Sequence, residues 1–251
     1  MTSDAMDIGD YLASGGKLTS PGNAPPRYRA ELMRMMAIFV DSELAGAAGF
    51  ADVINAGPGV KERIAAARIV LEKNDHAERV LRLMGEFGAN TDRYVTHHPW
   101  THRLPRDADL QGKRLHEDMR LPVFNYPLDG WSDAVMMNLL MGEATHIQLG
   151  DYQGLSYQPL ADVFREILPV ERRHAELAYE GLEKLGASEA LQASAAYWWP
   201  RVAASFGRGT TKRDDTLRKF GLRRSANEDL LAAWQKSAGS KLTELGLKTP
   251  A

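Results

Sequence analysis

Apolar residues recur every three to four positions over four long segments of this chain, and this spacing predicts amphipathic helices. The segments are residues 28–54, 60–87, 131–153 and 159–185. The third segment is apolar nearly all round, which is typical of a helix at the centre of a protein. The pattern therefore predicts an all-α fold whose main element is a four-helix bundle.

Residues that interrupt helices lie at the ends of these segments. The first two helices are separated by Gly57-Pro58-Gly59, and Gly186 follows the fourth helix as its expected C-cap. Pro169 lies inside the fourth segment. It is expected to kink that helix, because proline has no amide hydrogen and its ring crowds the preceding turn.

The remaining segments extend this bundle. Residues 1–26 are rich in glycine, serine and proline and are expected to form an extended N-terminal arm, which leaves residues 27–251 as one helical domain. Residues 88–129 contain several prolines and no long periodic stretch, so we expect a long excursion over the bundle. Shorter helices are expected at residues 110–119, 189–206 and 227–245.

The composition is that of a globular protein and excludes several kinds of site. A net charge of -2 gives no electrostatic reason to expect nucleic acid or an anionic membrane as a partner. The absence of cysteine excludes disulfides, thiolate metal ligands, iron–sulfur clusters and cysteine nucleophiles. No secretory signal and no membrane-spanning apolar run is recognisable, so we expect a cytoplasmic location.

Glutamate and histidine occur together, one turn apart, on the apolar faces of three predicted helices. The pairs are Glu72/His76, Glu143/His146 and Glu171/His174, and the first helix adds Glu43 alone. Buried acids and imidazoles are costly unless they are paired, hydrogen-bonded or bound to metal. Helical bundles often solve this with two carboxylate-bridged metal ions, using Glu from two helices and Glu-x-x-His from two others.

Each candidate ligand also has a structural interpretation. Glu171 and His174 have the expected spacing, and Glu43 has no cation near it on its own helix face. Glu72 and His76 are one residue further apart, so a hydrogen-bonded pair in the core is as good an explanation as a metal site. For Glu143, burial in the core with local hydrogen bonds is favoured.

Lys73 conflicts with a two-metal centre. It lies in one of the two adjacent apolar stripes of the second helix, and Glu72 lies in the other, so both can point inward. A buried ammonium close to Glu43 and Glu171 would satisfy both acids by salt bridges without any metal. Alternatively, the lysine methylenes can extend along the helix and carry the ammonium to the surface.

Two further polar clusters lie outside the long helices. His97, His98, Trp100 and His102 occur close together, and a structured loop is favoured over a metal site because no acid has matching spacing. Lysines and arginines gather in residues 212–224. That run is either a solvated loop or a contact for a phosphorylated or CoA-bearing ligand or for an acidic partner subunit.

A set of motifs along the chain resembles the phenylacetic acid catabolic family, and in particular the catalytic subunit of phenylacetyl-CoA epoxidase. The motifs are Ser42-Glu43, Phe124-Asn125-Tyr126-Pro127 with Trp131, Tyr157 with Pro159, Glu171-x-x-His174, Trp198-Trp199-Pro200 with Phe206-Gly207, and Leu245-Gly246-Leu247. The resemblance implies a ferritin-like bundle with additional short helices and a di-iron oxygenase acting on an aromatic or acyl-CoA substrate. It also implies a homo- or hetero-oligomer with a related helical subunit and a reductase.

The family's ligand positions are only partly kept in this sequence. Ligand positions are matched by Glu43, His76, Glu171 and His174. The resemblance places one further acid at position 73 and another at position 142, where this chain has Lys73 and Gly142. Glu72 and Glu143 lie one residue from these positions, which is about 100° around a helix.

Three hypotheses follow from this incomplete set. The first is a di-iron oxygenase with displaced ligands, namely Glu43, Glu72, His76, Glu143, Glu171 and His174. The second is a metal-free structural subunit or scaffold in which Lys73 replaces the charge of the metal. The third is a single metal held by His76, Glu171 and His174.

Overall fold

The computed structural model describes residues 8–110, 118–207, 209 and 211–250, and apart from one isolated bridge their regular secondary structure is helical. Four long helices form the bundle, namely α2 (Pro26–Val53), α3 (Val60–Glu86), α5 (Gly130–Tyr152) and α6 (Gln158–Leu185). The predicted all-α, ferritin-like class is confirmed. Each long helix begins and ends within two residues of the bounds expected from the sequence.

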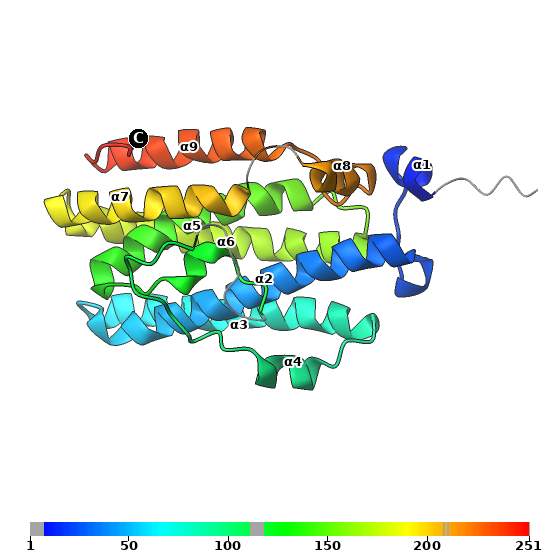
Figure 1. Cartoon of the computed structure of the whole chain (residues 1–251). Coiled ribbons are helices and arrows are strands. Elements are labelled where there is room, and N and C mark those ends of the chain that lie inside the picture. The colour runs from blue at the N-terminus through cyan, green and yellow to red at the C-terminus, as the bar shows by residue number, and fades with distance from the viewer. Residues whose placement is uncertain (1–7, 111–117, 208, 210, 251) are drawn as a thin grey trace, which may run out of the picture.

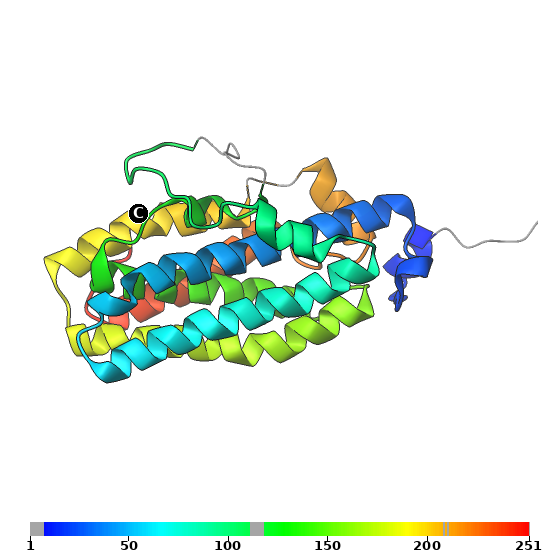
Figure 2. The same cartoon turned by 90° about the horizontal axis from the view of Figure 1, so that it is seen from below.

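The helices are arranged in layers along a common direction. Figure 1 shows α2 and α3 on one side of α5 and α6, with α7 (Glu189–Ala203) and α9 (Asn227–Glu244) on the other side. The view in Figure 2 shows the same long helices running nearly parallel. Helix α5 packs against α6, α7 and α9, and most of its residues are buried, as its apolar sequence predicts.

The residues expected to interrupt helices act in different ways. Gly186 ends α6 with a positive φ of 71°, a backbone conformation that favours glycine. Pro169 lies within α6, which continues on both sides of it as one helix. The first-turn positions of α2 and α6 hold prolines, whose missing amide hydrogen costs nothing there.

Several short elements differ from expectation. The predicted helix at residues 189–206 is present as α7 followed by the 3-10 turn η4 (Ala204–Phe206). Two polar helices were not predicted, α4 (Thr91–His97) and α8 (Lys212–Lys219), and the second lies in the expected basic loop. The sequence features that could have indicated these two helices are their N-terminal caps. Asn90 caps α4, and a capping box of Thr211 and Asp214 begins α8. The helix expected at residues 110–119 falls mainly outside the described residues.

The N-terminal arm is folded against the bundle for part of its length. Its described part contains the short helix α1 (Ile8–Ala13) and the 3-10 turn η1 (Pro21–Asn23), so it is not extended throughout. Leu18 is buried, and its backbone pairs with that of Ser156 and Gln158. The arm therefore covers the end of the bundle where α5 connects to α6.

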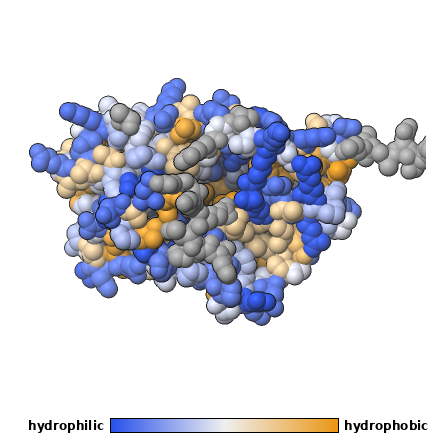
Figure 3. Space-filling model, viewed as in Figure 1, coloured by the Kyte–Doolittle hydropathy of each residue, from blue (hydrophilic) through white to orange (hydrophobic). Residues whose placement is uncertain are grey.

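The length and apolar character of the described helices bear on whether one of them could span a membrane. None of the helices in the described ranges combines the length and the apolar character needed to cross a bilayer. The face in Figure 3 is mostly hydrophilic, with smaller apolar areas between the polar side chains.

Asp41 on α2 holds the excursion after α4 against the bundle. Its side chain is fully buried and accepts hydrogen bonds from the Tyr94 hydroxyl, the Trp100 indole N–H and the Met119 backbone N–H. Three donors thus converge on one carboxyl group from distant parts of the chain. The contact fixes the start of the segment that runs across α2.

Replacing Asp41 is expected to destabilise the fold through these three donors. Each buried donor left without an acceptor costs about 1–3 kcal/mol, so Asp41→Ala should lower the free energy of unfolding by roughly 3 kcal/mol or more. Urea denaturation measures this loss. The matched control is Asp52→Ala, an exposed aspartate on the same helix, which should change stability by no more than about 0.5 kcal/mol. Equal effects of the two substitutions would contradict the role given to Asp41.

Candidate functional site: a buried ion cluster

Four ionisable side chains from three helices meet inside the bundle, and we call them the ion cluster. Lys73 Nζ lies 3.0 Å from Glu171 Oε1 and 3.3 Å from Glu43 Oε1. His76 Nδ1 lies 3.0 Å from Glu171 Oε1 and 3.3 Å from Glu43 Oε2. The exposed fraction of these side chains is 12% for Lys73, 6% for Glu43, 3% for His76 and 1% for Glu171.

The cluster forms because of where these residues lie on their helices. Lys73 and His76 are three residues apart on α3 and therefore project from one face of it. Glu43 lies in the buried stripe of α2, and Glu171 lies in that of α6. Each carboxylate thus reaches α3 from a neighbouring helix, and the two cationic groups lie between them.

The two carboxylates favour the protonated forms of their neighbours. Burial lowers the pKa of Lys73, but Glu171 and Glu43 raise it by more, so the net shift is upward. Burial likewise lowers the pKa of His76, yet hydrogen bonds and charge attraction from both acids raise it to about 9. Burial raises the pKa of Glu171, and the opposing effects of Lys73, His174 and His76 bring it well below its usual value. At neutral pH, Lys73 and His76 are both cations.

His174 lies beside the ion cluster and contacts Glu72, which was considered as a partner of His76. Its Nε2 lies 2.7 Å from Glu72 Oε2, and its ring stacks on that of His76 with centroids 6.0 Å apart. Its Nδ1 is buried, lies 3.4 Å from Glu171 Oε1 and has no hydrogen-bond partner among the described residues. The core pair considered for Glu72 therefore exists, but with His174 instead of His76.

Glu143 is directed away from the ion cluster. It accepts a hydrogen bond of 2.6 Å from Ser237 Oγ, and Lys241 Nζ lies 3.4 Å from its Oε1. Both partners are on α9, on the opposite side of α5 from α2. Glu143 is thus a buried acid with local partners, which was the favoured interpretation, and the structure does not bring it to the other candidate ligands.

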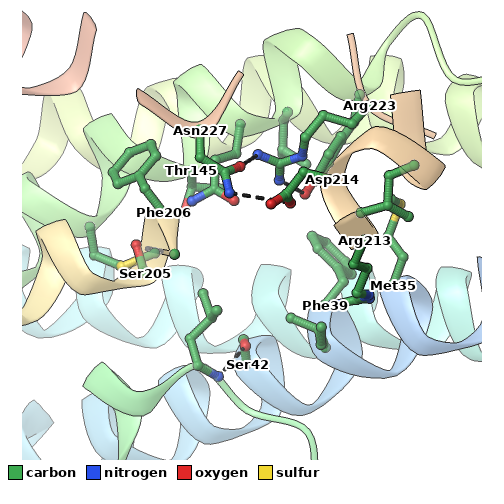
Figure 4. Close-up of a pocket in the computed structure, with 18 of the residues that line it drawn as sticks. Met35, Phe39, Ser42, Thr145, Ser205, Phe206, Arg213, Asp214, Arg223 and Asn227 are labelled. Atoms are coloured by element: carbon green, nitrogen blue, oxygen red, sulfur yellow. Dashed lines mark hydrogen bonds between the residues drawn. The ribbon is translucent and has the colours of Figure 1, made fainter. Parts of the chain in front are cut away.

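A cavity of about 320 Å³ adjoins the cluster, and Glu43 forms part of its wall. Figure 4 shows its polar rim, where Asp214, Arg223 and Asn227 meet and Arg213 lies nearer to Phe39 and Met35. The wall is assembled from α2, α5, α8, α9 and connecting segments, so no single stretch of sequence indicates it. Two arginines of the basic run thus lie at a cavity rim.

Comparison with known proteins assigns the chain to a family. The family model described as phenylacetic acid catabolic protein matches residues 17–251, almost the whole chain. The chain belongs to the phenylacetic acid catabolic protein family. A search of the curated proteins found no match.

Members of this family are expected to have a di-iron centre, so the fit of two metal ions can be tested on the residues present. Glu43, His76 and Glu171 each offer a ligand atom within 4.8 Å of the others and could hold one metal ion. The Lys73 ammonium, however, already contacts both carboxylates at 3.0–3.4 Å. A metal ion between these acids requires Lys73 to move away.

The backbone at Gly142 leaves no room for the side chain of a further metal ligand. A Cβ atom on Gly142 would lie 2.9 Å from Ala175 Cβ and 3.2 Å from Ala175 Cα. Helices α5 and α6 therefore touch where the resemblance places an acid, and an acidic side chain there would force them apart. Neither Glu72 nor Glu143 replaces the missing ligands, because each binds another partner. As the side chains lie, this family member does not fit a two-metal centre.

Removing the lysine should destabilise the protein through the two acids that it contacts. We expect Lys73→Met to lower the free energy of unfolding by about 3–5 kcal/mol, the usual cost of leaving a buried charge without its partner. The measurement is chemical denaturation in the presence of a chelator. Lys61→Met on the same helix is the matched control, because Lys61 is exposed. Equal midpoints for wild type and Lys73→Met would contradict the pairing.

Stability should also depend on pH through His76. The pKa of this imidazole rises from 6.5 to about 9 on folding, so its contribution is fully present below pH 6.5 and is lost as the pH rises through about 9. We expect wild type to lose on the order of 3 kcal/mol of stability over that interval, because each tenfold difference in proton affinity corresponds to about 1.4 kcal/mol. Denaturation at several pH values should show that His76→Gln flattens this profile and that the exposed-site control His97→Gln does not. Superimposable wild-type and His76→Gln profiles would contradict the assignment.

Proposed function

We propose that this chain serves the phenylacetic acid catabolic family as a metal-free, non-catalytic subunit or scaffold. One observation carries the proposal: Lys73 Nζ lies 3.0 Å from Glu171 and 3.3 Å from Glu43, the two acids that would hold a metal ion. The ammonium supplies the positive charge that buried carboxylates need. The bundle is then stable without iron, and its contribution is binding.

Electrostatic repulsion supports this choice over a shared site. An ammonium and a divalent ion a few ångströms apart in a protein interior repel each other by several kcal/mol. Without a metal, burial lowers the pKa of Lys73, and Glu171 and Glu43 raise it by more, so the two acids hold the lysine as a cation. Lys73 and a metal ion are therefore alternatives, and the contacts of Lys73 favour the lysine.

The partners we propose follow from this role. A subunit without a redox group acts by contact with other chains, and a related helical subunit of the same family is the expected partner in a homo- or hetero-oligomer. A reductase and an acyl-CoA substrate belong to the catalytic alternative, because both serve a metal centre.

A second candidate function is a di-iron or single-metal oxygenase. The observation in its favour is the group formed by Glu43, His76 and Glu171, whose ligand atoms lie within 4.8 Å of one another. Bound iron would supply oxygen activation for an aromatic or acyl-CoA substrate. The single-metal set that includes His174 uses the Nδ1 atom of this histidine, which lies 3.4 Å from Glu171 Oε1, while Glu72 holds its Nε2 atom.

Metal content decides between these functions. Protein produced with added iron should contain iron, manganese and zinc only well below one ion per chain, measured by plasma mass spectrometry. Lys73→Glu should gain metal, because it removes the cation and adds an anionic ligand next to Glu43, His76 and Glu171. Lys73→Gln is the matched control, since it removes the charge without adding a carboxylate. One or two ions bound tightly to the wild-type chain would contradict the metal-free function.

The close contact between Gly142 and Ala175 provides a second test of metal binding. Adding Gly142→Asp to Lys73→Glu should not give a second metal ion, because the new side chain meets Ala175. A further Ala175→Gly change removes the nearest obstructing atom and should allow more metal than the double variant. A double variant that binds two ions would show that α5 and α6 separate easily and that the contact at Gly142 does not close the site.

A further inference from the structure

Helix α3 carries an apolar stripe on the side that faces away from the bundle. Val60, Ile64, Ala67 and Leu71 are exposed, and the exposed fractions of the three larger side chains are 74%, 56% and 69%. Six large apolar side chains are exposed in the described part of the chain, so half of them lie in this one stripe. We call these four residues the outer stripe. Figure 2 shows α3, in cyan, with no other helix drawn in front of it.

The outer stripe and the ion cluster lie on opposite faces of α3. At 100° per residue, the centre of the stripe is about 180° from that of Lys73 and His76. The inner face is covered by α2 and α6, from which Glu43 and Glu171 contact this helix. Single exposed apolar residues are ordinary, but a continuous row of them is typical of a contact site.

The spacing of the outer stripe indicates that a helix covers it. Its four residues are separated by four, three and four positions, which is the spacing of a coiled-coil seam. Ala67 is the small residue in the row and allows the axis of a second helix to come close. A helix that packs here with a similar row of apolar residues buries the stripe along three turns.

The charged residues beside the outer stripe are available to a partner. Lys61 is exposed and forms no ion pair within the described ranges of the chain. Asp75 lies on the same flank and is half exposed. Its Oδ2 accepts a hydrogen bond from Arg79, while its Oδ1 has no partner among the described residues. The flank therefore begins with a free cation and ends with an acid that can accept another contact.

These apolar and charged positions are complementary to those of a second copy. The midpoint between Ile64 and Leu71 lies beside Arg68, and the midpoint between Lys61 and Asp75 is Arg68 itself. An antiparallel copy related by a two-fold axis at this point therefore brings Ile64 against Leu71 of the second copy. The same arrangement brings Lys61 beside Asp75 of the second copy, and symmetry forms each contact twice.

Arg68 provides an opposing contact. Beside a two-fold axis, it lies close to Arg68 of the second copy. Both side chains are exposed and long, so water and salt screen their repulsion. The two pairs of opposite charge outnumber this contact between like charges.

We propose that two copies of this chain associate through the outer stripe, with their α3 helices antiparallel about a two-fold axis beside Ala67 and Arg68. The inference deepens the proposed function and rests on it for the statement that the chain acts by contact with other chains. It names a second copy as the partner and the outer face of α3 as the surface.

Sedimentation velocity of the full chain over a series of concentrations tests this association. We expect a monomer–dimer equilibrium with a dissociation constant on the order of 10 µM, because the apolar contact is small. Protein that stays monomeric at about 100 µM would overturn the inference and leave the stripe to a different chain.

Leu71→Asp tests whether the outer stripe is the contact. It should weaken the dimer at least about thirtyfold, because the substitution occurs twice in the interface and buries two carboxylates. Val95→Asp is the matched control, since Val95 is an exposed apolar residue on α4 and away from the stripe. Circular dichroism confirms that both variants keep their helical content. Equal dissociation constants for wild type and Leu71→Asp would overturn the inference.

A charge exchange tests the antiparallel register. Lys61→Asp and Asp75→Lys should each weaken the dimer about tenfold, because each places like charges together at two points. The double variant with both substitutions should return to within about threefold of wild type, since opposite charges face each other again. Arg68→Gln should tighten the dimer. A double variant no stronger than the single variants, or weaker association of Arg68→Gln, would overturn the proposed register.

The oligomeric state and the metal content are measured on the same sample. Metal-loaded protein that dimerises as described would refute the metal-free function alone. Metal-free protein that remains monomeric would refute the association through α3 alone.

Discussion

The ammonium of Lys73 lies between carboxylates of two other helices, and the centre of the bundle depends on this contact. Glu43 on α2 and Glu171 on α6 would each be costly in an apolar core without a cation. Lys73 and the protonated His76, both on α3, give these acids two positive charges from one helix face. The contact is thus both an electrostatic balance and a mechanical link between α2, α3 and α6.

The two departures from the family's ligand pattern are consistent with each other. The resemblance implies acids at positions 73 and 142 in addition to Glu43 and Glu171, and such a set needs the charge of two metal ions. With Lys73 and Gly142 in their place, two carboxylates remain and two side-chain cations balance them. The charges are balanced, and the space for a side chain at position 142 is also filled, because α5 and α6 touch at Gly142 and Ala175.

Much of the fold, but less of the site, could be predicted from the sequence. The 3.6-residue period places the long helices, and it places Glu43, His76 and Glu171 on buried faces. The helical period does not indicate which residue of a neighbouring helix a buried side chain contacts. Glu143 lies on a helix buried nearly all round, so nothing in the sequence indicates that its partners are on α9. Glu72 is one residue from a ligand position, and that rotation of about 100° is enough to pair it with His174 instead. The short helices α4 and α8 have polar sequences, so only their caps could have predicted them.

The ion cluster also determines the charge on one wall of the neighbouring cavity. Here the wall presents the carboxylate of Glu43, whose charge is already balanced by Lys73 and His76. The two carboxylates of the ion cluster balance its two cations, so the cluster presents no uncompensated positive charge to the cavity. A lysine at a position where the resemblance places an acid thus alters the electrostatics of the cavity wall as well as those of the bundle core.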